Sequence, residues 1–257
     1  MKPKNVLFIM SDQHQGKASG CYGHDFAVTP NIDRLAARGT RFTTAYTNSA
    51  ICVPARAVIA TGRHIFESEY WCNAHPYDGR IKSWHHLLAE NGSSATSIGK
   101  LHFRNETDPT GFAEQVIPMH VVEGKGDLRS CIKRPMAEPM KSSVSMTNIG
   151  PGESPYTKYD HDIADRTCDW LRAKAEGDGD DPFFLFTSFV CPHPPYIAPP
   201  EFYDLYPTDR IPTPKLSDPD AVTHPWIYKM ERNRNYNDFL TEESRRVLLS
   251  SYYGCIS

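Results

Sequence analysis

Two apolar runs constrain the fold more than any other feature of this sequence. Residues 5–10 and 183–190 are almost continuously apolar, and polar side chains follow each run: Asp12 and Gln13 after the first, His193 after the second. Such runs are typical of strands that are buried on both faces of a parallel sheet. Ligands of open α/β sheets bind at the carboxyl ends of the strands. We therefore expect these polar residues at a functional edge.

Helix patterns alternate with the strand patterns. Thr29 as N-cap, Pro30 at the first helical position and Gly39 as a stop predict a helix between them. Further elements are predicted as strands at 40–46 and 95–98, and as helices at 55–60, from Trp84 to Asn91, from near Asp160 to the acidic turn 176–182, and from Thr241 onwards. The alternation predicts an α/β fold with a mostly parallel central sheet and helices on both faces. Residues 104–157 read as irregular excursions over the sheet edge.

Composition excludes several classes of protein. The 28 Lys and Arg nearly cancel the 31 Asp and Glu, which argues against a nucleic-acid binder. The apolar runs are far shorter than the ~20 residues of a membrane helix. Residues 11–14 are polar where a signal peptide would still be apolar, so we expect a cytoplasmic protein without a membrane partner. The seven cysteines form no Cys-x-x-Cys pair, which disfavours a disulfide framework or a zinc ribbon.

Four strand or turn endings carry residues suited to chemistry. They are Asp12-Gln13, the stretch from Cys52 to Arg56, Lys100 with His102, and His193. Each has an ordinary explanation when it is taken alone: a loop carboxylate, an inert packed thiol, a solvated helix charge, a strand exit or a structural loop histidine. A parallel sheet would gather all four at one edge, which favours a joint functional role.

One of these stretches resembles a known family signature. Cys52-Val53-Pro54-Ala55-Arg56, followed by Thr61-Gly62-Arg63, is similar to the signature of the type I sulfatases of the alkaline phosphatase superfamily. The resemblance covers essentially the whole chain, and its further motifs are the opening at 5–13, the helix start at 29–35, Gly99-Lys100-x-His102 and Pro192-His193-x-Pro195. The opening Ser11-Asp12-Gln13-His14 most resembles the branch that contains choline sulfatase and phosphonate monoester hydrolases.

The resemblance implies the chemistry at position 52. In this family the cysteine is oxidised to formylglycine, here by a formylglycine-generating enzyme acting on Cys52. The hydrated aldehyde attacks sulfur, and its second hydroxyl lets the covalent sulfate intermediate collapse to sulfate. A divalent cation, Ca²⁺ or alternatively Mg²⁺ or Mn²⁺, would be held by Asp12, Gln13 and the residue at position 52. The implied reaction is hydrolysis of a small-molecule or carbohydrate sulfate ester to alcohol and sulfate.

The remaining site residues receive roles from the same resemblance. Arg56 lies one helical turn beyond Cys52 and would hold the diol oxygens. Lys100 and His102 are two residues apart, hence on one face of an extended segment, and would neutralise sulfate oxygens. His102 or His193 would protonate the leaving alkoxide, and His193 would also contact substrate. Asn73 lies where the related branch carries a substrate-contacting amide.

The sequence departs from the family pattern in its second half. Family members complete the metal site with an Asp followed by Asn or His after a further strand, whereas Asp160-His161 precedes a helix here and is not assigned. We therefore expect residues 1–257 to be the N-terminal portion of a catalytic domain, without the second metal-ligand segment and the smaller C-terminal domain, and inactive alone. Two alternatives stay open: a phosphonate or phosphate ester hydrolase, and a non-catalytic remnant with unmodified Cys52.

Overall fold

The chain folds into two compact units. The computed structural model describes residues 5–126, 147–177, 182–212, 224–225, 227–228 and 239–257. The first unit lies within Met1–Asp12, Thr44–Cys131 and Tyr159–Val190, and the second within Gln13–Thr43, Ile132–Lys158 and Cys191–Ser257. Among the described helices, none is both long and apolar enough to cross a membrane.

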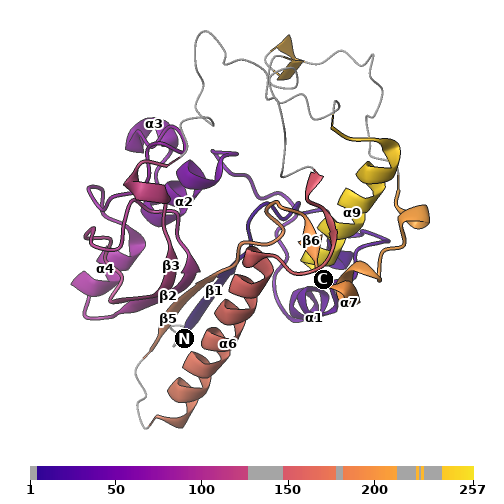
Figure 1. The fold of residues 1–257 in the computed structure, drawn as a ribbon. Coiled ribbons are helices and arrows are strands. Elements are labelled where there is room, and N and C mark those ends of the chain that lie inside the picture. The colour runs from indigo at the N-terminus through magenta and orange to yellow at the C-terminus, as the bar shows by residue number, and fades with distance from the viewer. Residues whose placement is uncertain (1–4, 127–146, 178–181, 213–223, 226, 229–238) are drawn as a thin grey trace. The chain divides into compact units, whose positions relative to one another are not determined.

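A four-stranded parallel sheet forms the centre of the first unit (Figure 1). Its strands, in spatial order, are β1 (Val6–Met10), β5 (Phe184–Ser188), β2 (Ala95–Lys100) and β3 (Glu114–Met119). In the register of the sheet, Ser188 pairs with both Met10 and Gly99. Because all strands are parallel, their carboxyl ends share one edge. The predicted fold class is confirmed.

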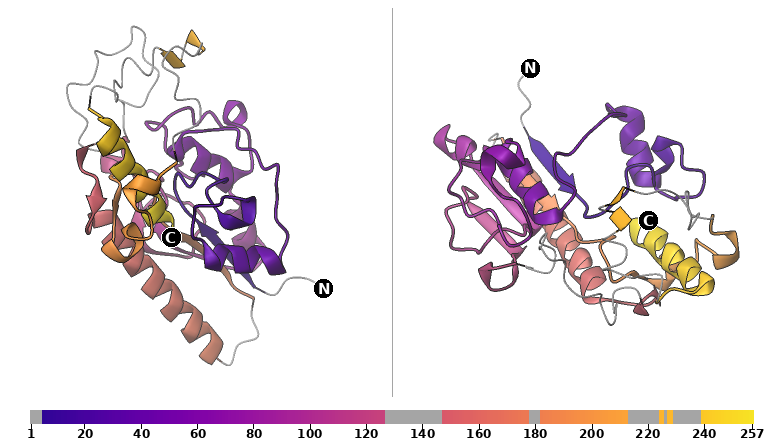
Figure 2. Two further views of the ribbon diagram at one scale, coloured as in Figure 1. Left: turned by 90° about the vertical axis from the view of Figure 1, so that its right-hand side faces the viewer. Right: turned by 90° about the horizontal axis from the view of Figure 1, so that it is seen from above.

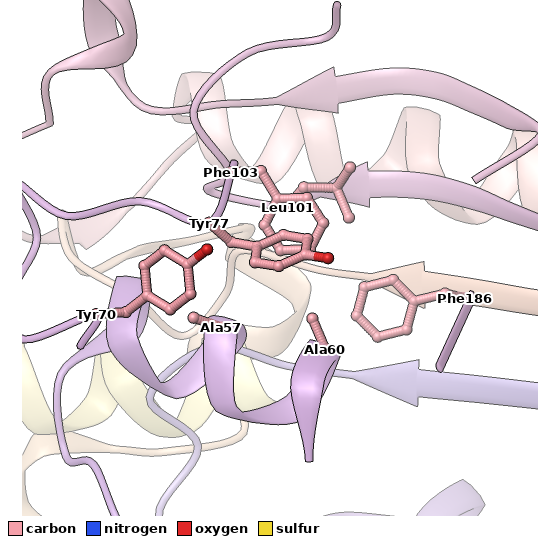
Figure 3. Packing of buried hydrophobic residues seen from close by; sticks show 7 residues of the cluster. All are labelled: Ala57, Ala60, Tyr70, Tyr77, Leu101, Phe103 and Phe186. Carbon is pink, nitrogen blue, oxygen red and sulfur yellow. The ribbon is translucent and has the colours of Figure 1, made fainter. Parts of the chain in front are cut away.

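Helices cover both faces of this sheet (Figure 2). The alternation of side chains along β5 sends Leu185 and Phe186 to opposite faces. Leu185 packs with Ile98 and with Ile163 of α6 (Pro155–Glu176). Phe186 belongs to the cluster of the other face, shown in Figure 3, with residues of α2 (Cys52–Thr61) and its surroundings: Ala57, Ala60, Tyr70, Tyr77, Leu101 and Phe103. The short helices α3 (Ile65–Ser68), α4 (Trp84–Glu90) and η2 (Val122–Gly124) complete the unit.

The second unit is built around the helix α9 (Glu242–Ile256). A two-stranded parallel sheet of β4 (Gly150–Pro151) and β6 (Ile197–Ala198) packs against it. Gly254 allows this close approach, because a Cβ there would lie 2.7 Å from the Ala198 side chain. The unit also contains η1 (Gly20–Tyr22), α1 (Pro30–Arg38), α7 (Pro200–Tyr203) and η4 (Thr208–Arg210).

Several sequence-based element predictions are wrong in detail. Residues 40–46 form no strand, because their alternating side chains Phe42 and Tyr46 are exposed and pack against no sheet face. β1 is not buried on both faces: Val6, Leu7, Phe8 and Ile9 are 37–56% exposed, since β5 is its only strand neighbour among the described residues. The irregular stretch 104–157 contains β3, although residues 127–146 of it lie outside the described part. Helix α6 begins at Pro155, before Asp160.

Gly99 of β2 lies against the neighbouring strand β5 and against helix α6. Its φ is +98°, and a Cβ there would lie 2.3 Å from the Ser188 carbonyl oxygen and 2.7 Å from Ile163 Cδ1. Both contacts are shorter than real Cβ contacts, so β2 and β5 can approach in this register only without a side chain at this position.

We expect Gly99→Ala to lower the free energy of unfolding by about 2–5 kcal/mol, because left-handed strain and overpacking add. The matched control is Gly92→Ala, whose φ of +74° brings the same kind of strain but whose Cβ would meet nothing within 4 Å. The control should lose only about 1–2 kcal/mol. Urea unfolding of both variants checks this, and equal losses would contradict the steric explanation.

The buried side chain of His85 should make the stability of the fold depend on pH. Its ring is fully buried, stacks on Phe112 with centroids 4.0 Å apart, and places Nδ1 2.6 Å from Ser83 Oγ. Burial lowers the pKa of His85 to about 3. An unfolded histidine has a pKa of about 6.5, so between these values the unfolded chain binds a proton that the folded chain does not.

Stability should therefore fall as the pH drops from about 6.5 towards 3, with a contribution from His85 of at most about 1.4 kcal/mol per pH unit. His85→Gln should flatten the dependence of the unfolding free energy on pH in this window. His64→Gln, at an exposed histidine, is the matched control and should keep the slope of the parent. Urea titrations at pH 6.5 and 4.5 measure it, and parallel slopes for all three proteins would refute the assignment.

Candidate active site

The site lies where the strands of the first unit end. Asp12 follows β1 by two residues, Lys100 is the last residue of β2, and Ser188 is the last residue of β5. Cys52 is the first residue of α2, and Arg56 follows one helical turn later on the same helix. The parallel register and this helix start thus bring side chains from four distant segments together.

Three buried charges form the base of the site. Asp12, Arg56 and Lys100 are only 6%, 3% and 1% exposed. Lys100 Nζ pairs with Asp12 Oδ2, and Arg56 Nη2 lies 3.5 Å from the same oxygen. One carboxylate therefore faces two cations, and the cluster carries a positive excess that favours an oxyanion.

Arg56 is held in place by groups other than Asp12. Its Nη1 donates to the Lys100 backbone carbonyl and, at 2.9 Å, to Ser188 Oγ. Burial lowers the pKa of Lys100, while the Asp12 carboxylate opposes that shift. Close pairing with Asp12, rather than solvent, is thus what offsets the cost of burying these two cations.

Cys52 points toward an amide and an imidazole. Its Sγ lies 3.7 Å from Asn73 Oδ1 and 3.7 Å from His102 Nδ1. Asn73 Oδ1 also accepts from the backbone N–H of Val53 at 3.3 Å, which fixes the amide at the start of α2. Burial, and next the charge of Asp12, raises the pKa of the Cys52 thiol. A neutral thiol at pH 7 is a poor nucleophile.

His102 reaches Cys52 through an unusual backbone conformation. Its φ is +51°, and its backbone N–H donates to the Met119 carbonyl at 2.7 Å. The prediction that Lys100 and His102 share one face of an extended segment is therefore wrong, because His102 itself adopts a left-handed conformation. The two side chains still meet the same cluster: Lys100 contacts Asp12, and His102 contacts Cys52.

Two predicted site residues belong to the second unit. The carbonyl of Gln13 accepts from the Tyr252 hydroxyl at 3.0 Å, and its φ is +62°. His193 directs Nδ1 to the Pro194 carbonyl at 2.8 Å and meets the Tyr156 ring edge-on. The first unit brings together the other six predicted residues, namely Asp12, Cys52, Arg56, Asn73, Lys100 and His102. The catalytic roles of all eight stay predictions.

Sequence reasoning missed Ser188. Its hydroxyl accepts from a guanidinium that is 132 positions away in the chain. A serine at the end of an apolar strand has no pattern that marks it as a site residue. Only its position within the apolar run 183–190, at the end of β5, pointed to this edge of the sheet.

The donors fit one side of a site for a hard cation. Asp12 offers a buried carboxylate, and such oxygens are preferred ligands of Ca²⁺ and Mg²⁺. However, among the described residues no group of three or more His, Cys, Asp or Glu side chains is placed to hold a metal ion. Because Ca²⁺ takes about 6–8 oxygen ligands, the described residues are not a complete ligand set.

Without the Asp12 carboxylate, the buried charges of Lys100 and Arg56 should destabilise the fold. We expect Asp12→Asn to lower the free energy of unfolding by about 3–5 kcal/mol. Adding Lys100→Met should recover part of this loss, with a coupling energy above about 1 kcal/mol in the double-mutant cycle. The matched control is the exposed pair Lys82–Glu90, where the same cycle should give less than about 1 kcal/mol. Equal couplings in chemical denaturation would contradict the buried pairing.

Characterised relatives match almost the whole chain. The choline-sulfatase of Rhizobium meliloti (strain 1021) is 30% identical over 262 residues, which cover 98% of this chain and 51% of the relative. An arylsulfatase of Clostridium perfringens is 28% identical and is matched over 100% of this chain and 57% of its own length. The chain thus spans about half the length of the curated relatives it matches.

Solved structures share the fold. The phosphonate monoester hydrolase of Agrobacterium radiobacter gives a TM-score of 0.72 at 21% identity, over 99% of this chain and 56% of that chain. A protein solved in complex with its substrate D-glucosamine-2-N,6-O-disulfate gives a TM-score of 0.60 at 22% identity, over 98% and 53% of the two chains. At these identities the similarity shows the sulfatase-like fold alone.

The pattern of one protein family covers the sequence from end to end. The family described as Sulfatase matches residues 4–256. Together with the choline-sulfatase and the phosphonate monoester hydrolase, this match confirms the resemblance seen in the motif around Cys52. The chain belongs to the sulfatase family, in its type I branch.

Proposed function

We propose that this chain supplies the sulfate-binding half of a sulfuric ester hydrolase, which cleaves a sulfate monoester to alcohol and sulfate. The observation that carries the proposal is the buried pair of cations, Arg56 and Lys100, beside Cys52 at the start of α2. The prediction that residues 1–257 are the N-terminal portion of a larger catalytic domain belongs to this proposal.

The cluster suits a tetrahedral oxyanion. Arg56 and Lys100 exceed the charge of Asp12, and their low exposure means that water screens them little. Charge that develops on the sulfate oxygens would be stabilised by groups that are already oriented, which is the main electrostatic source of catalysis. Asn73 and His102, each 3.7 Å from Cys52 Sγ, would orient the residue at position 52 and the ester bond beside it.

Position 52 needs a nucleophile other than its thiol. Burial raises the pKa of the Cys52 thiol and leaves little thiolate at pH 7. The family match and the motif from Cys52 to Arg56 support conversion of this residue by a formylglycine-generating enzyme. Formylglycine would supply a hydroxyl of the hydrated aldehyde for attack on sulfur. The nearby His102 imidazole is the group placed to move a proton at this position or to the leaving alkoxide.

A divalent cation forms part of the proposal. Members of the family generally use a metal ion, and Asp12 and Gln13 would supply some of its oxygen ligands, with Ca²⁺ preferred over Mg²⁺ or Mn²⁺. When bound, the ion would lower the pKa of the attacking hydroxyl and draw charge from the sulfate oxygens. The described residues alone do not complete its ligand set.

A second candidate is hydrolysis of phosphonate monoesters. The solved phosphonate monoester hydrolase shares the fold at a TM-score of 0.72. Phosphonate monoesters and sulfate monoesters are both tetrahedral monoanions, so Arg56 and Lys100 suit either one. The ratio of kcat/KM for 4-nitrophenyl sulfate and 4-nitrophenyl phenylphosphonate separates the two activities.

The nucleophile assignment is tested by mass and by turnover together. In protein from the native host we expect the peptide that contains Cys52 to be lighter by roughly 18 Da than the unmodified peptide, because the thiol has become an aldehyde. Cys52→Ala should abolish hydrolysis of 4-nitrophenyl sulfate. Cys168→Ala, at an exposed cysteine of α6, is the control and should keep full activity. Ester cleavage by a protein with an unaltered sulfur at position 52 would contradict the proposed formylglycine nucleophile.

A further inference from the structure

A polar cavity opens in the first unit outside the cluster of Asp12, Arg56 and Lys100. Its volume is about 370 Å³, within the range of small-molecule sites. Most of its wall comes from the segment 69–80, which follows α3, and the rest from Arg104 and Gly124. The side chains that matter for recognition are Tyr70, Trp71, His75, Asp78, Arg80 and Arg104.

The cavity adjoins the residues that contact Cys52. Asn73 touches the thiol, and the next residue, Ala74, lines the cavity. His102 touches the thiol from the other side, and Arg104, two residues later, lines the cavity as well. Since consecutive Cα atoms are about 3.8 Å apart, both walls begin within about 8 Å of chain from the two residues that contact Cys52. The alcohol part of an ester held at position 52 can therefore reach this cavity.

The polar groups of the wall are fixed in advance. Asp78 accepts from the Tyr70 hydroxyl at 2.8 Å and from the Arg80 backbone N–H at 3.2 Å. Its second oxygen lies 3.4 Å from Arg104 Nη1, and Arg104 Nε donates to Asp108 at 2.8 Å. The Arg80 guanidinium donates from Nη2 to the Ser68 carbonyl at 3.0 Å. The two guanidinium groups and the carboxylate are thus each held by protein partners, which reduces the ordering cost when a ligand binds.

Trp71 is the one wall residue with a large apolar face left open. Trp71 is 52% exposed. The neighbouring ring of Tyr70, by contrast, is covered by Arg80, whose guanidinium carbon lies 4.6 Å from the ring centre. An open indole next to fixed carboxylate and guanidinium groups offers two kinds of contact. The indole packs against an apolar ring face, and the charged groups form hydrogen bonds to polar groups at the ring edge.

These wall groups disfavour other alcohols. A quaternary ammonium group is bound best by several open aromatic faces, but only the Trp71 indole is open here, because Arg80 already covers the Tyr70 ring. Arg80 and Arg104 also bring two positive charges to the same wall, which repel a cation. A purely apolar aryl group would displace water from Asp78 and Arg104 without replacing its hydrogen bonds. A polyhydroxylated ring has both an apolar C–H face and hydroxyl groups that donate and accept.

We propose that this cavity binds the alcohol part of the ester and that this part is a carbohydrate ring, stacked on Trp71 with its hydroxyls on Asp78 and Arg104. The assignment rests on the proposed ester hydrolysis, because it names the leaving alcohol of that reaction. It makes Trp71 a specificity-determining residue.

Turnover tests the proposal by comparing leaving alcohols in the mature native protein. Trp71→Ala should lower kcat/KM for N-acetylglucosamine 6-sulfate by about tenfold or more, mainly through KM, and change that for 4-nitrophenyl sulfate by less than about twofold. Trp71→Phe should restore most of the loss. Phe66→Ala removes a 69% exposed aromatic side chain outside the cavity and should leave both substrates unchanged. Equal losses on both substrates, or a Trp71-dependent preference for choline sulfate, would overturn the assignment.

A binding measurement separates this proposal from the reaction itself. In Cys52→Ala protein, saturation-transfer NMR with the methyl glycosides of N-acetylglucosamine and glucuronic acid should detect binding to the parent and to Phe66→Ala, but not to Trp71→Ala. Trp71-dependent binding without turnover of any sulfate ester would leave the cavity assignment standing and remove the proposed function. Turnover of sulfate esters without Trp71-dependent sugar binding would leave the proposed function standing and remove the cavity assignment.

Discussion

The burial of Asp12 between Lys100 and Arg56 is the interaction on which the rest of the site depends. A lone charge in this position would be strongly unfavourable, and each of the three is tolerated because the others are present. The pairing requires that β1, β2 and the start of α2 meet at one edge. The parallel register around β5, with Gly99 permitting the close approach of β2, provides that meeting point.

Sequence patterns predicted those parts of the fold whose cause is local. The helix α1 follows from its Thr29–Pro30 start, and β5 from an apolar run that the strands on both sides bury. Asp12 and Lys100 were found because they lie at strand ends, whereas Cys52 and Arg56, at the start of α2, were found through the family signature. β3 was not predicted, because Glu114, Gln115 and Pro118 interrupt the apolar pattern that predicts a strand. The exposure of β1 depends on strand neighbours, and periodicity within one segment carries no information about neighbours.

The sequence predicted which residues form the site better than it predicted the contacts between them. Lys100 and His102 were expected to act side by side, but a left-handed residue sends them to different partners. Ser188 belongs to the site because its hydroxyl accepts a hydrogen bond from Arg56, which lies far away in the sequence. Both features arise from tertiary geometry at strand ends, where the regular period of two stops. A motif therefore names the residues of such a site, whereas the register of the sheet decides which atoms touch.

The cluster and the cavity place opposite demands on the fold. Lys100 and Arg56 are buried and paired, so a change there disturbs folding together with oxyanion binding. Trp71 is half exposed, and substitutions at such surface positions usually alter stability little. In the proposed function, recognition of the charged sulfate would thus be tied to the structural core of the first unit, while recognition of the alcohol would depend on a half-exposed side chain. Because the two sets of residues adjoin next to Cys52, through Asn73 and His102, the proposed hydrolase would be able to change its alcohol without rebuilding the groups that hold the ester.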